Sequence, residues 1–163
     1  MDCINNNSSI ILVSSDSRRI SIKYKAAKRS KFIKHFVKDF PGQEIHFQNI
    51  VYSTLLKIKE YLEFYQDKKP KTIEMPLPKK DFKECVDEFD YNYINIDTEK
   101  IFEIMLAANF MDIKYLLDLT SAKIASILKG KSPSEIRRVL NMDKDIDELD
   151  EIGNNKNIEN LVD

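Results

Sequence analysis

At 163 residues the chain is long enough for one core-forming domain of ordinary size with a small additional segment. Its net charge of -1 argues against a generally cationic binder of nucleic acid or membranes. Two cysteines, Cys3 and Cys85, are too few and too far apart for a disulfide framework or a zinc site, and the sequence lacks both a secretory apolar region and an apolar run of about 18 residues that could span a bilayer. We expect a soluble intracellular protein with free thiols.

The charges are unevenly distributed. Residues 18–38, which begin with Arg18 and end with Lys38, contain nine Lys or Arg residues and no acid, whereas residues 143–163 contain eight acids and two lysines. Charge runs of this kind usually form solvated surface, and we adopt that interpretation. A phosphate-binding role for the basic stretch is the alternative.

Strands and helices are intermixed in the first half of the chain. Residues 10–13 and 18–24 are rich in β-branched residues and flank the turn-forming residues 15–17, which predicts a β-hairpin. Residues 26–40 have helical spacing. Residues 44–50 are compatible with a third short strand, and residues 53–67 predict a helix.

Residues 68–81 are rich in proline and lysine and mark the most evident internal loop. After the loop, the pattern predicts helices only. Residues 81–96 contain one helix with an extended end at 93–96. Asp97 is expected to cap a helix that ends at Phe110. Its predicted inward residues are Ile101, Phe102, Met105, Leu106 and Ala108.

Asp112 is expected to cap the next helix, which carries two apolar stripes. The first stripe comprises Ile113, Leu116, Thr120 and Ile127, and the second comprises Leu117, Ser121, Ile124 and Leu128. One stripe can serve the core and the other a partner. The alternative is that both stripes are ordinary core.

A short helix follows Gly130, which suits the left-handed conformation that ends a helix. Ser132 and Glu135 fit a capping box, and Pro133 fits the first helical turn. The predicted helix ends near residue 141, and a still shorter candidate spans 146–152. Helices below about 12 to 15 residues are marginal alone, so these segments resemble one half of an interface.

The sequence carries no recognisable catalytic constellation. His35 and His46 lie in differently patterned segments, and no glycine-rich phosphate loop is present. We therefore expect no enzymatic activity, no cofactor and no metal site.

The stretch IFEIMLAANFMDIKYLLDLTSAKIASILKGKSPSEIRRVLNM, residues 101–142, closely resembles part of the S-phase kinase-associated protein family. Members of that family are small adaptors that join F-box proteins to a cullin in SCF ubiquitin ligases. The N-terminal half agrees through SSD, AAKRSKFIK, where the family pattern is A-K-x-S-x-x-I-K, and NI leading into LLKIKEYLEFYQDKKP. These collinear motifs cover nearly all of residues 10–142.

The resemblance implies an α+β fold. It consists of a BTB/POZ domain, with a small three-stranded sheet and surrounding helices, and a C-terminal helical extension. Residues 1–112 would then form the BTB/POZ core and cullin-binding region, and residues 113–163 the F-box-binding helices. Whether the tail after residue 153 is disordered stays open. The implied function is that of a non-catalytic adaptor, located in the cytoplasm and nucleus, that supports substrate ubiquitination and proteasomal degradation.

The resemblance assigns two sets of contact residues. Asn109 and Phe110 match the family's cullin-contacting loop, with phenylalanine in place of the commoner tyrosine. The alternative is that Phe110 belongs to the core and Asn109 closes the helix. The implied F-box contacts are Phe102, Leu117, Ser121, Ile124, Leu128, Ile136, Val139, Leu140 and Met142. Pro133 matches a proline that is hydroxylated and glycosylated in protist relatives.

The sequence departs from the family pattern in two places. The loop at residues 68–81 is basic, whereas relatives often have an acidic loop there. The chain also lacks the tryptophan near the family's C-terminus, and Gly153 disfavours helix continuation. The second departure affects the C-terminal contact that the family makes with the F-box, and therefore the affinity for F-box proteins or the range of partners.

Other partners define the alternatives. An elongin-C-like protein would share the BTB core but lack the GKSPSEIRRVL extension. A self-associating BTB scaffold, or a weak homodimer formed in the absence of partners, is a second alternative. Nucleic-acid binding through residues 18–38 is a third, whereas our main interpretation includes neither nucleic acid nor membrane as a partner.

Overall fold

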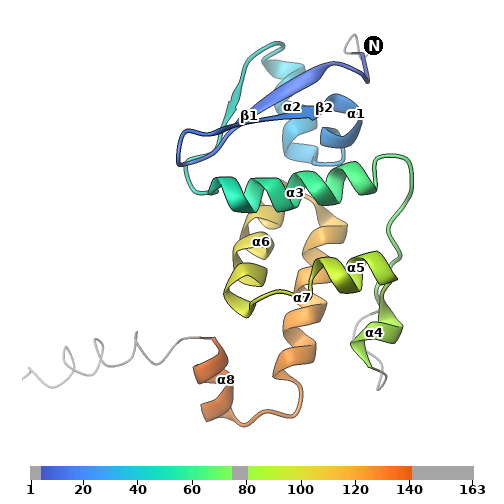
Figure 1. Ribbon diagram of the computed structural model, residues 1–163, viewed down its shortest axis with the longest axis vertical. Helices are drawn as coiled ribbons and strands as arrows, with labels where there is room; N and C mark the ends of the chain where they lie inside the picture. The colour runs from blue at the N-terminus through green and yellow to red at the C-terminus, as the bar shows by residue number, and fades with distance from the viewer. Residues whose placement is uncertain (1–4, 75–80, 141–163) are drawn as a thin grey trace, which may run out of the picture. The chain divides into compact units, whose positions relative to one another are not determined.

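The computed structural model describes residues 5–74 and 81–140 (Figure 1). The chain divides into two compact units, Met1–Ser126 and Ile127–Asp163. The predicted functional boundary between residues 112 and 113 lies inside the first unit and stays a prediction.

The sheet lies in the first unit and has the strand order β2-β1-β3. Strands β1 (Ser9–Val13) and β2 (Arg19–Lys23) pair antiparallel and form the predicted hairpin. Ile10 and Leu12 on β1, and Ile20 and Ile22 on β2, alternate with more exposed residues and point into the core. Strand β3 (Ile45–His46) pairs parallel with β1, and it is shorter than the predicted third strand.

The predicted helix at residues 26–40 is two helices, α1 (Tyr24–Ala27) and α2 (Lys31–Asp39). Ser30 separates them because its side chain caps α2, accepting a hydrogen bond from the Ile33 amide at 3.1 Å. Its hydroxyl also donates to the Met111 carbonyl at 2.6 Å. A serine that can make both bonds favours the cap over a continuous helix.

Helix α3 (Tyr52–Phe64) confirms the prediction at residues 53–67 and buries Leu55, Ile58 and Leu62. It packs against α6, α1 and β2, and Figure 1 shows it crossing between the sheet and the following helices of the first unit.

The region 81–96 differs from the prediction. It forms α4 (Phe82–Cys85) and α5 (Glu88–Tyr93), separated by the extended and buried Val86. The predicted extended end at 93–96 is wrong, because Tyr93 belongs to α5 and Ile94 follows with φ -94° and ψ 1°.

Helix α6 (Thr98–Phe110) follows Asp97, which occupies the predicted N-cap position although its carboxylate makes no capping hydrogen bond. The helix buries Ile101, Ile104, Ala107 and Ala108. The prediction that Leu106 points inward is wrong, since this residue is 66% exposed. Leu106 is five residues from Ile101, which places it about 140° around the helix from the buried side.

Helix α7 spans Lys114–Leu128. Asp112 does not occupy the predicted capping position, because it has a left-handed φ of 48° in the turn between α6 and α7. Its carboxylate instead lies 3.5 Å from the Lys31 ammonium.

The second unit contains α8 (Pro133–Val139), which has the predicted capping box. The Ser132 amide donates to Glu135 Oε2 at 2.7 Å, and the Glu135 amide donates to Ser132 Oγ at 3.4 Å. Gly130 has the expected positive φ of 77°. Met142, the predicted helix at 146–152, the tail after 153 and Cys3 lie outside the described residues.

Candidate protein-binding surfaces

The C-terminal end of α6 exposes large apolar side chains beside a groove. Leu106 is 66% exposed and Phe110 57%, and Val51, the residue before α3, is 43% exposed. The groove has a volume of about 780 Å³. It is lined by residues 46–51 and Thr54 on one side and by Glu103, Leu106, Ala107, Asn109 and Phe110 on the other. We call this set of residues the α6 groove.

Two aromatic rings pack against the Phe110 ring. Its ring centroid lies 5.1 Å from that of Phe32 on α2 and 6.2 Å from that of Phe47, the residue after β3. Phe47 itself is buried. One face of Phe110 is therefore held by the fold while more than half of the side chain stays exposed, so a partner could bury it at low entropic cost.

The turn after Phe110 is fixed to the start of α2. The Met111 carbonyl accepts hydrogen bonds from Ser30 Oγ at 2.6 Å and from the Phe32 amide at 3.4 Å. Met111 is fully buried and closes α6, so Asn109 is an exposed surface residue and not the helix cap. The alternative in which Phe110 is core and Asn109 is the cap is wrong.

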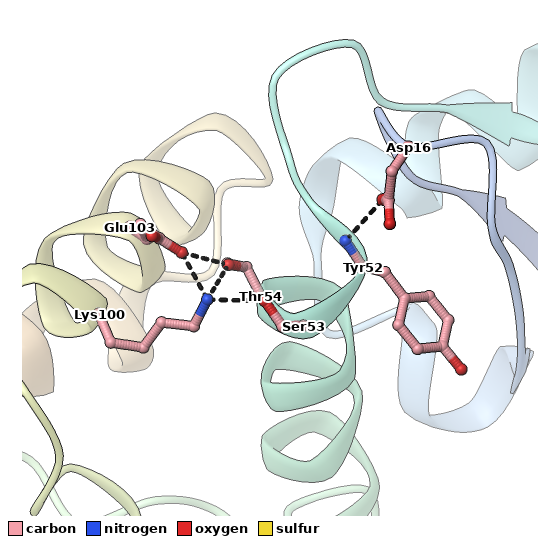
Figure 2. Close-up of polar contacts among 6 residues, drawn as sticks. All are labelled: Asp16, Tyr52, Ser53, Thr54, Lys100 and Glu103. Atoms are coloured by element: carbon pink, nitrogen blue, oxygen red, sulfur yellow. Dashed lines mark hydrogen bonds and ion pairs between the residues drawn. The ribbon is translucent and has the colours of Figure 1, made fainter.

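The polar side of the α6 groove ties α3 to α6 (Figure 2). Glu103 accepts hydrogen bonds from Lys100 at 2.6 Å and from Thr54 at 2.7 Å, and these bonds lower the pKa of the Glu103 carboxyl. Lys100 also donates to Ser53 at 2.8 Å. A carboxylate held ionised beside apolar side chains gives the groove a directional polar contact.

The N-terminus of α3 is held by Asp16 in the hairpin turn (Figure 2). Its carboxylate accepts a hydrogen bond from the Tyr52 amide at 2.9 Å. A side-chain hydrogen bond with Ser14 is the main cause that lowers the pKa of Asp16, and the Tyr52 amide acts in the same direction. The hairpin thereby positions the start of α3 and the Val51 side of the groove.

The two stripes of α7 differ in burial, as the spacing predicts. Ile113, Leu116 and Thr120 are at most 3% exposed. The second stripe, Leu117, Ser121 and Ile124, is half-buried. Within the first unit, therefore, the second stripe retains surface that the core does not use.

The remaining members of the two stripes lie in the second unit. Ile127 and Leu128 are both half-buried, so the expected contrast is absent at that end of α7. Sequence reasoning also missed the buried Leu119 and Ala122. Their spacing of three residues from Leu116 to Leu119 to Ala122 was the available signal.

The other predicted F-box contacts are also partly exposed. Phe102 on α6 is half-buried, as are Ile136, Val139 and Leu140 on or next to α8. Pro133 is exposed in the first turn of α8, and its modification stays a prediction.

Other chemistry is sparse in the part of the chain that the structure describes. No group of three or more His, Cys, Asp or Glu side chains is placed there to hold a metal ion. His35 is exposed, and His46 lies 3.8 Å from Glu44 at the edge of the groove. None of the helices in the described ranges is both long and apolar enough to cross a membrane.

Comparison of the sequence with known proteins identifies the family of this chain. The Skp1 family tetramerisation domain matches residues 8–67, and the Skp1 family dimerisation domain matches residues 114–157. The S-phase kinase-associated protein 1 homolog of Tetrahymena thermophila is 40% identical over 136 residues, which cover 82% of each chain. This chain belongs to the Skp1 family.

Fungal members of the Skp1 family agree with this assignment. The E3 ubiquitin ligase complex SCF subunit sconC of Arthroderma benhamiae is 37% identical over 138 residues, covering 83% of this chain and 84% of the relative. The sconC subunit of Arthroderma otae is 37% identical over 140 residues, covering 85% of each chain. The predicted family and α+β BTB/POZ fold are confirmed, and the match at 114–157 includes the extension that an elongin-C-like chain would lack.

Membership of the Skp1 family does not assign individual residues. The contact roles of Asn109, Phe110 and the F-box set stay predictions. The structure adds Leu106, Val51 and the supporting Phe32 to the surface around Phe110. The four-residue spacing of Leu106 and Phe110 was a signal for their common face, whereas nothing local in the sequence links Val51 or Phe32 to α6.

Proposed function

We propose that this chain is a non-catalytic adaptor that links F-box substrate receptors to a cullin scaffold in an SCF-type E3 ubiquitin ligase. In this role it supports ubiquitination of the recruited substrates and their degradation by the proteasome. Family membership and the names of the sconC relatives support the proposal. The observation that carries it is the pair Leu106 and Phe110, which the fold leaves more than half exposed beside a groove.

The α6 groove is the proposed cullin-binding surface. Phe110 and Leu106 would be its apolar anchors, and Asn109 would supply an amide at the rim. Exposed aromatic anchors with water-excluding neighbours are typical of interface hot spots. We expect the N-terminal region of a cullin to bury these side chains as a helical segment with apolar residues on one face.

We assign the proposed F-box contacts to each unit separately: Phe102 on α6 and the second stripe of α7 in the first unit, and the apolar residues of α8 in the second. Leu117, Ser121 and Ile124 are left half-buried, whereas Ile113, Leu116 and Thr120 of the first stripe are buried in the core. The short α8 carries no fully buried residue among those that the structure describes, which suits a helix that gains packing from a partner.

The proposed mechanism is positioning. An adaptor that holds a substrate receptor and a cullin at the same time raises the effective concentration of the substrate near the ubiquitin-transferring machinery. This mechanism needs no bond chemistry in the chain itself and no cofactor. We propose the cytoplasm and the nucleus as its location, which fluorescence microscopy of the tagged full chain can check.

Self-association is the second candidate function. The matching family models are described as dimerisation and tetramerisation domains, which favours a weak homodimer of the free chain. If the F-box surface forms that homodimer, an F-box segment should dissociate it. Sedimentation equilibrium of the chain with and without the segment measures this directly.

A binding assay with both partners tests the adaptor proposal. The full chain is immobilised and offered a purified F-box segment and a cullin N-terminal fragment, each alone. The proposal predicts retention of both, and failure to retain either one from solutions of about 10 µM, well above typical dissociation constants of stable complexes, would contradict it.

A further inference from the structure

The cations of the basic stretch at residues 18–38 differ in the contacts that they make. Arg18 lies over the Tyr52 ring at 3.5 Å, Arg19 pairs with Glu44 at 3.2 Å, and Lys31 pairs with Asp112. These three cations therefore already have partners from other segments of the fold. A different subset gathers around a separate pocket.

This pocket has a volume of about 500 Å³ and contains four cations. It is lined by Lys25, Lys28, Arg29 and Lys34 together with Asn6, Tyr24 and Gln66. The lining residues come from the segment before β1, from α1, from the turn between α1 and α2, from α2, and from the segment just after α3. We call it the basic pocket, and it shares no lining residue with the α6 groove.

The backbone that carries the cations is held firmly. Ala26 and Ala27 are fully buried, and so is Ser30, which caps α2. The Lys28 amide bonds to the Tyr24 carbonyl at 2.9 Å, and the Lys25 amide bonds to the Asn6 carbonyl at 3.0 Å. The pocket is thus assembled by folding, and the cations need only side-chain motion to meet a ligand.

The positive charges in the pocket are largely uncompensated. Lys28 donates to Asn6 Oδ1 at 2.9 Å and Arg29 donates to the Lys68 carbonyl at 2.6 Å, and both acceptors are neutral. Asp67 pairs with Lys25. Among the described residues no carboxylate pairs with Lys28, Arg29 or Lys34.

We propose that the basic pocket binds a small soluble anion that carries two or more phosphate groups. Single exposed ion pairs contribute little, so a ligand must engage several cations at once to bind usefully. Arg29 offers a planar fork suited to phosphate oxygens, and the lysines add point charges around it. A concave site of this volume fits a compact oligophosphate better than an extended polyanion.

Nucleic acid is the less favoured ligand for these residues. Arg18, Arg19 and Lys31 have partners outside the basic pocket, and the whole chain has a net charge of -1. An extended polyanion would need a continuous positive track, which this arrangement does not supply.

Titration calorimetry of the full chain with tripolyphosphate, in about 50 mM salt, tests the proposal. The double variant Lys28→Gln, Lys34→Gln is expected to weaken binding at least about tenfold, because charge-assisted bonds from two exposed side chains are lost. The matched control Lys23→Gln, Lys38→Gln removes the same charge from exposed positions outside the pocket and is expected to change binding less than about threefold. Thermal unfolding without ligand should be alike for all three proteins.

Three outcomes would overturn the proposal. The first is no heat and no shift of the thermal midpoint with millimolar tripolyphosphate. The second is equal weakening in both double variants, which would indicate diffuse charge attraction. The third is binding of a single-stranded oligonucleotide that excess tripolyphosphate does not displace, which would assign the stretch to nucleic acid. Because the cullin and F-box assays use other residues, none of these outcomes bears on the adaptor role.

Discussion

At the scale of single residues, Phe110 combines packing with exposure. Phe32 and Phe47 support its ring, and the turn at Met111 is bonded to the start of α2. The side chain is therefore presented in a defined position even though it is 57% exposed. This arrangement favours a contact anchor over a core residue.

Replacing Phe110 by Lys is expected to weaken binding of the cullin fragment at least about 30-fold. The replacement puts a charge where the cullin would otherwise bury an aromatic ring. F-box binding should be unchanged, and calorimetry measures both. The matched control is Phe40→Lys, since Phe40 is 50% exposed and lies outside the α6 groove. Loss of F-box binding in F110K would show that the residue supports folding and contradict its assignment as a contact.

Asp90 is a buried carboxyl that does not belong to either surface. It is 2% exposed and accepts a hydrogen bond from the Tyr65 hydroxyl at 2.8 Å. Burial raises the pKa of Asp90, although the Tyr65 hydrogen bond opposes this shift. Since the folded pKa is higher than the unfolded one, the stabilising contribution is complete below about pH 4 and is lost as pH rises through the folded pKa.

Asp90→Asn keeps an acceptor for Tyr65 and removes the titrating group. Relative to the original chain, its unfolding free energy should rise between pH 4 and pH 7, as urea denaturation at both pH values can measure. Asp81→Asn, which removes a carboxylate at an exposed position, is the matched control. A relative stability of D90N that falls with rising pH would contradict the assigned direction.

At the scale of elements, α7 divides its two sides between the core and the solvent within the first unit. Leu116 and Thr120 are fully buried, whereas Leu117 and Ile124 are half-buried. A helix stabilised by one buried side can keep the other for a partner without losing its own fold.

Ile124→Lys is expected to weaken F-box binding at least about tenfold while leaving cullin binding intact, because it places a charge in the proposed apolar contact. Ala125→Lys adds the same charge at the neighbouring exposed position and should retain both partners. Equal F-box affinity for I124K and A125K would remove the second stripe of α7 from the proposed interface.

Helix α8 depends on its cap, because it is short and none of its residues is fully buried. Ser132→Ala should raise hydrogen exchange of the helical amides about fivefold, since the loss of an N-cap costs about 1 kcal/mol of helix stability. Ser132→Asp should restore protection by supplying another capping oxygen. Equal exchange in S132A and S132D would mean that the capping box does not stabilise α8.

Prediction from sequence succeeded where local chemistry decides the structure. The hairpin turn, the end at Gly130 and the Ser132 capping box follow from residues within a few positions of one another. Prediction failed where a hydrogen bond between distant residues determines the local structure. At Ser30, the hydroxyl donates to the Met111 carbonyl, which lies far along the chain. The exposed side of Leu106 likewise depends on which side of α6 meets α3, which no local pattern shows.

The residues of the proposed sites also differ in whether the sequence alone could identify them. The resemblance supplied Asn109 and Phe110, and helical spacing separated the two stripes of α7. Val51 and the supporting Phe32 come from distant segments, so only the folded chain places them beside α6. The basic stretch was visible as a charge run, but its division between long-range ion pairs and a pocket requires tertiary structure.

At the scale of the whole molecule, the adaptor account requires two partner surfaces built from different residues. The α6 groove uses the end of α6 and residues 46–51, whereas the proposed F-box contacts are Phe102 on α6, which does not line the groove, and residues of α7 and α8. The turn at Asp112, bonded to the start of α2, joins α6 to α7 and lets one chain carry both sets.

Sedimentation velocity of an equimolar mixture of the full chain, a cullin N-terminal fragment and an F-box segment tests this requirement most directly. If the chain is an adaptor, one complex should form that contains one copy of each of the three components. Its sedimentation coefficient should be larger than that of either binary complex. If the cullin fragment and the F-box segment instead displace each other, so that only binary complexes form, the chain does not join two partners and the account is contradicted.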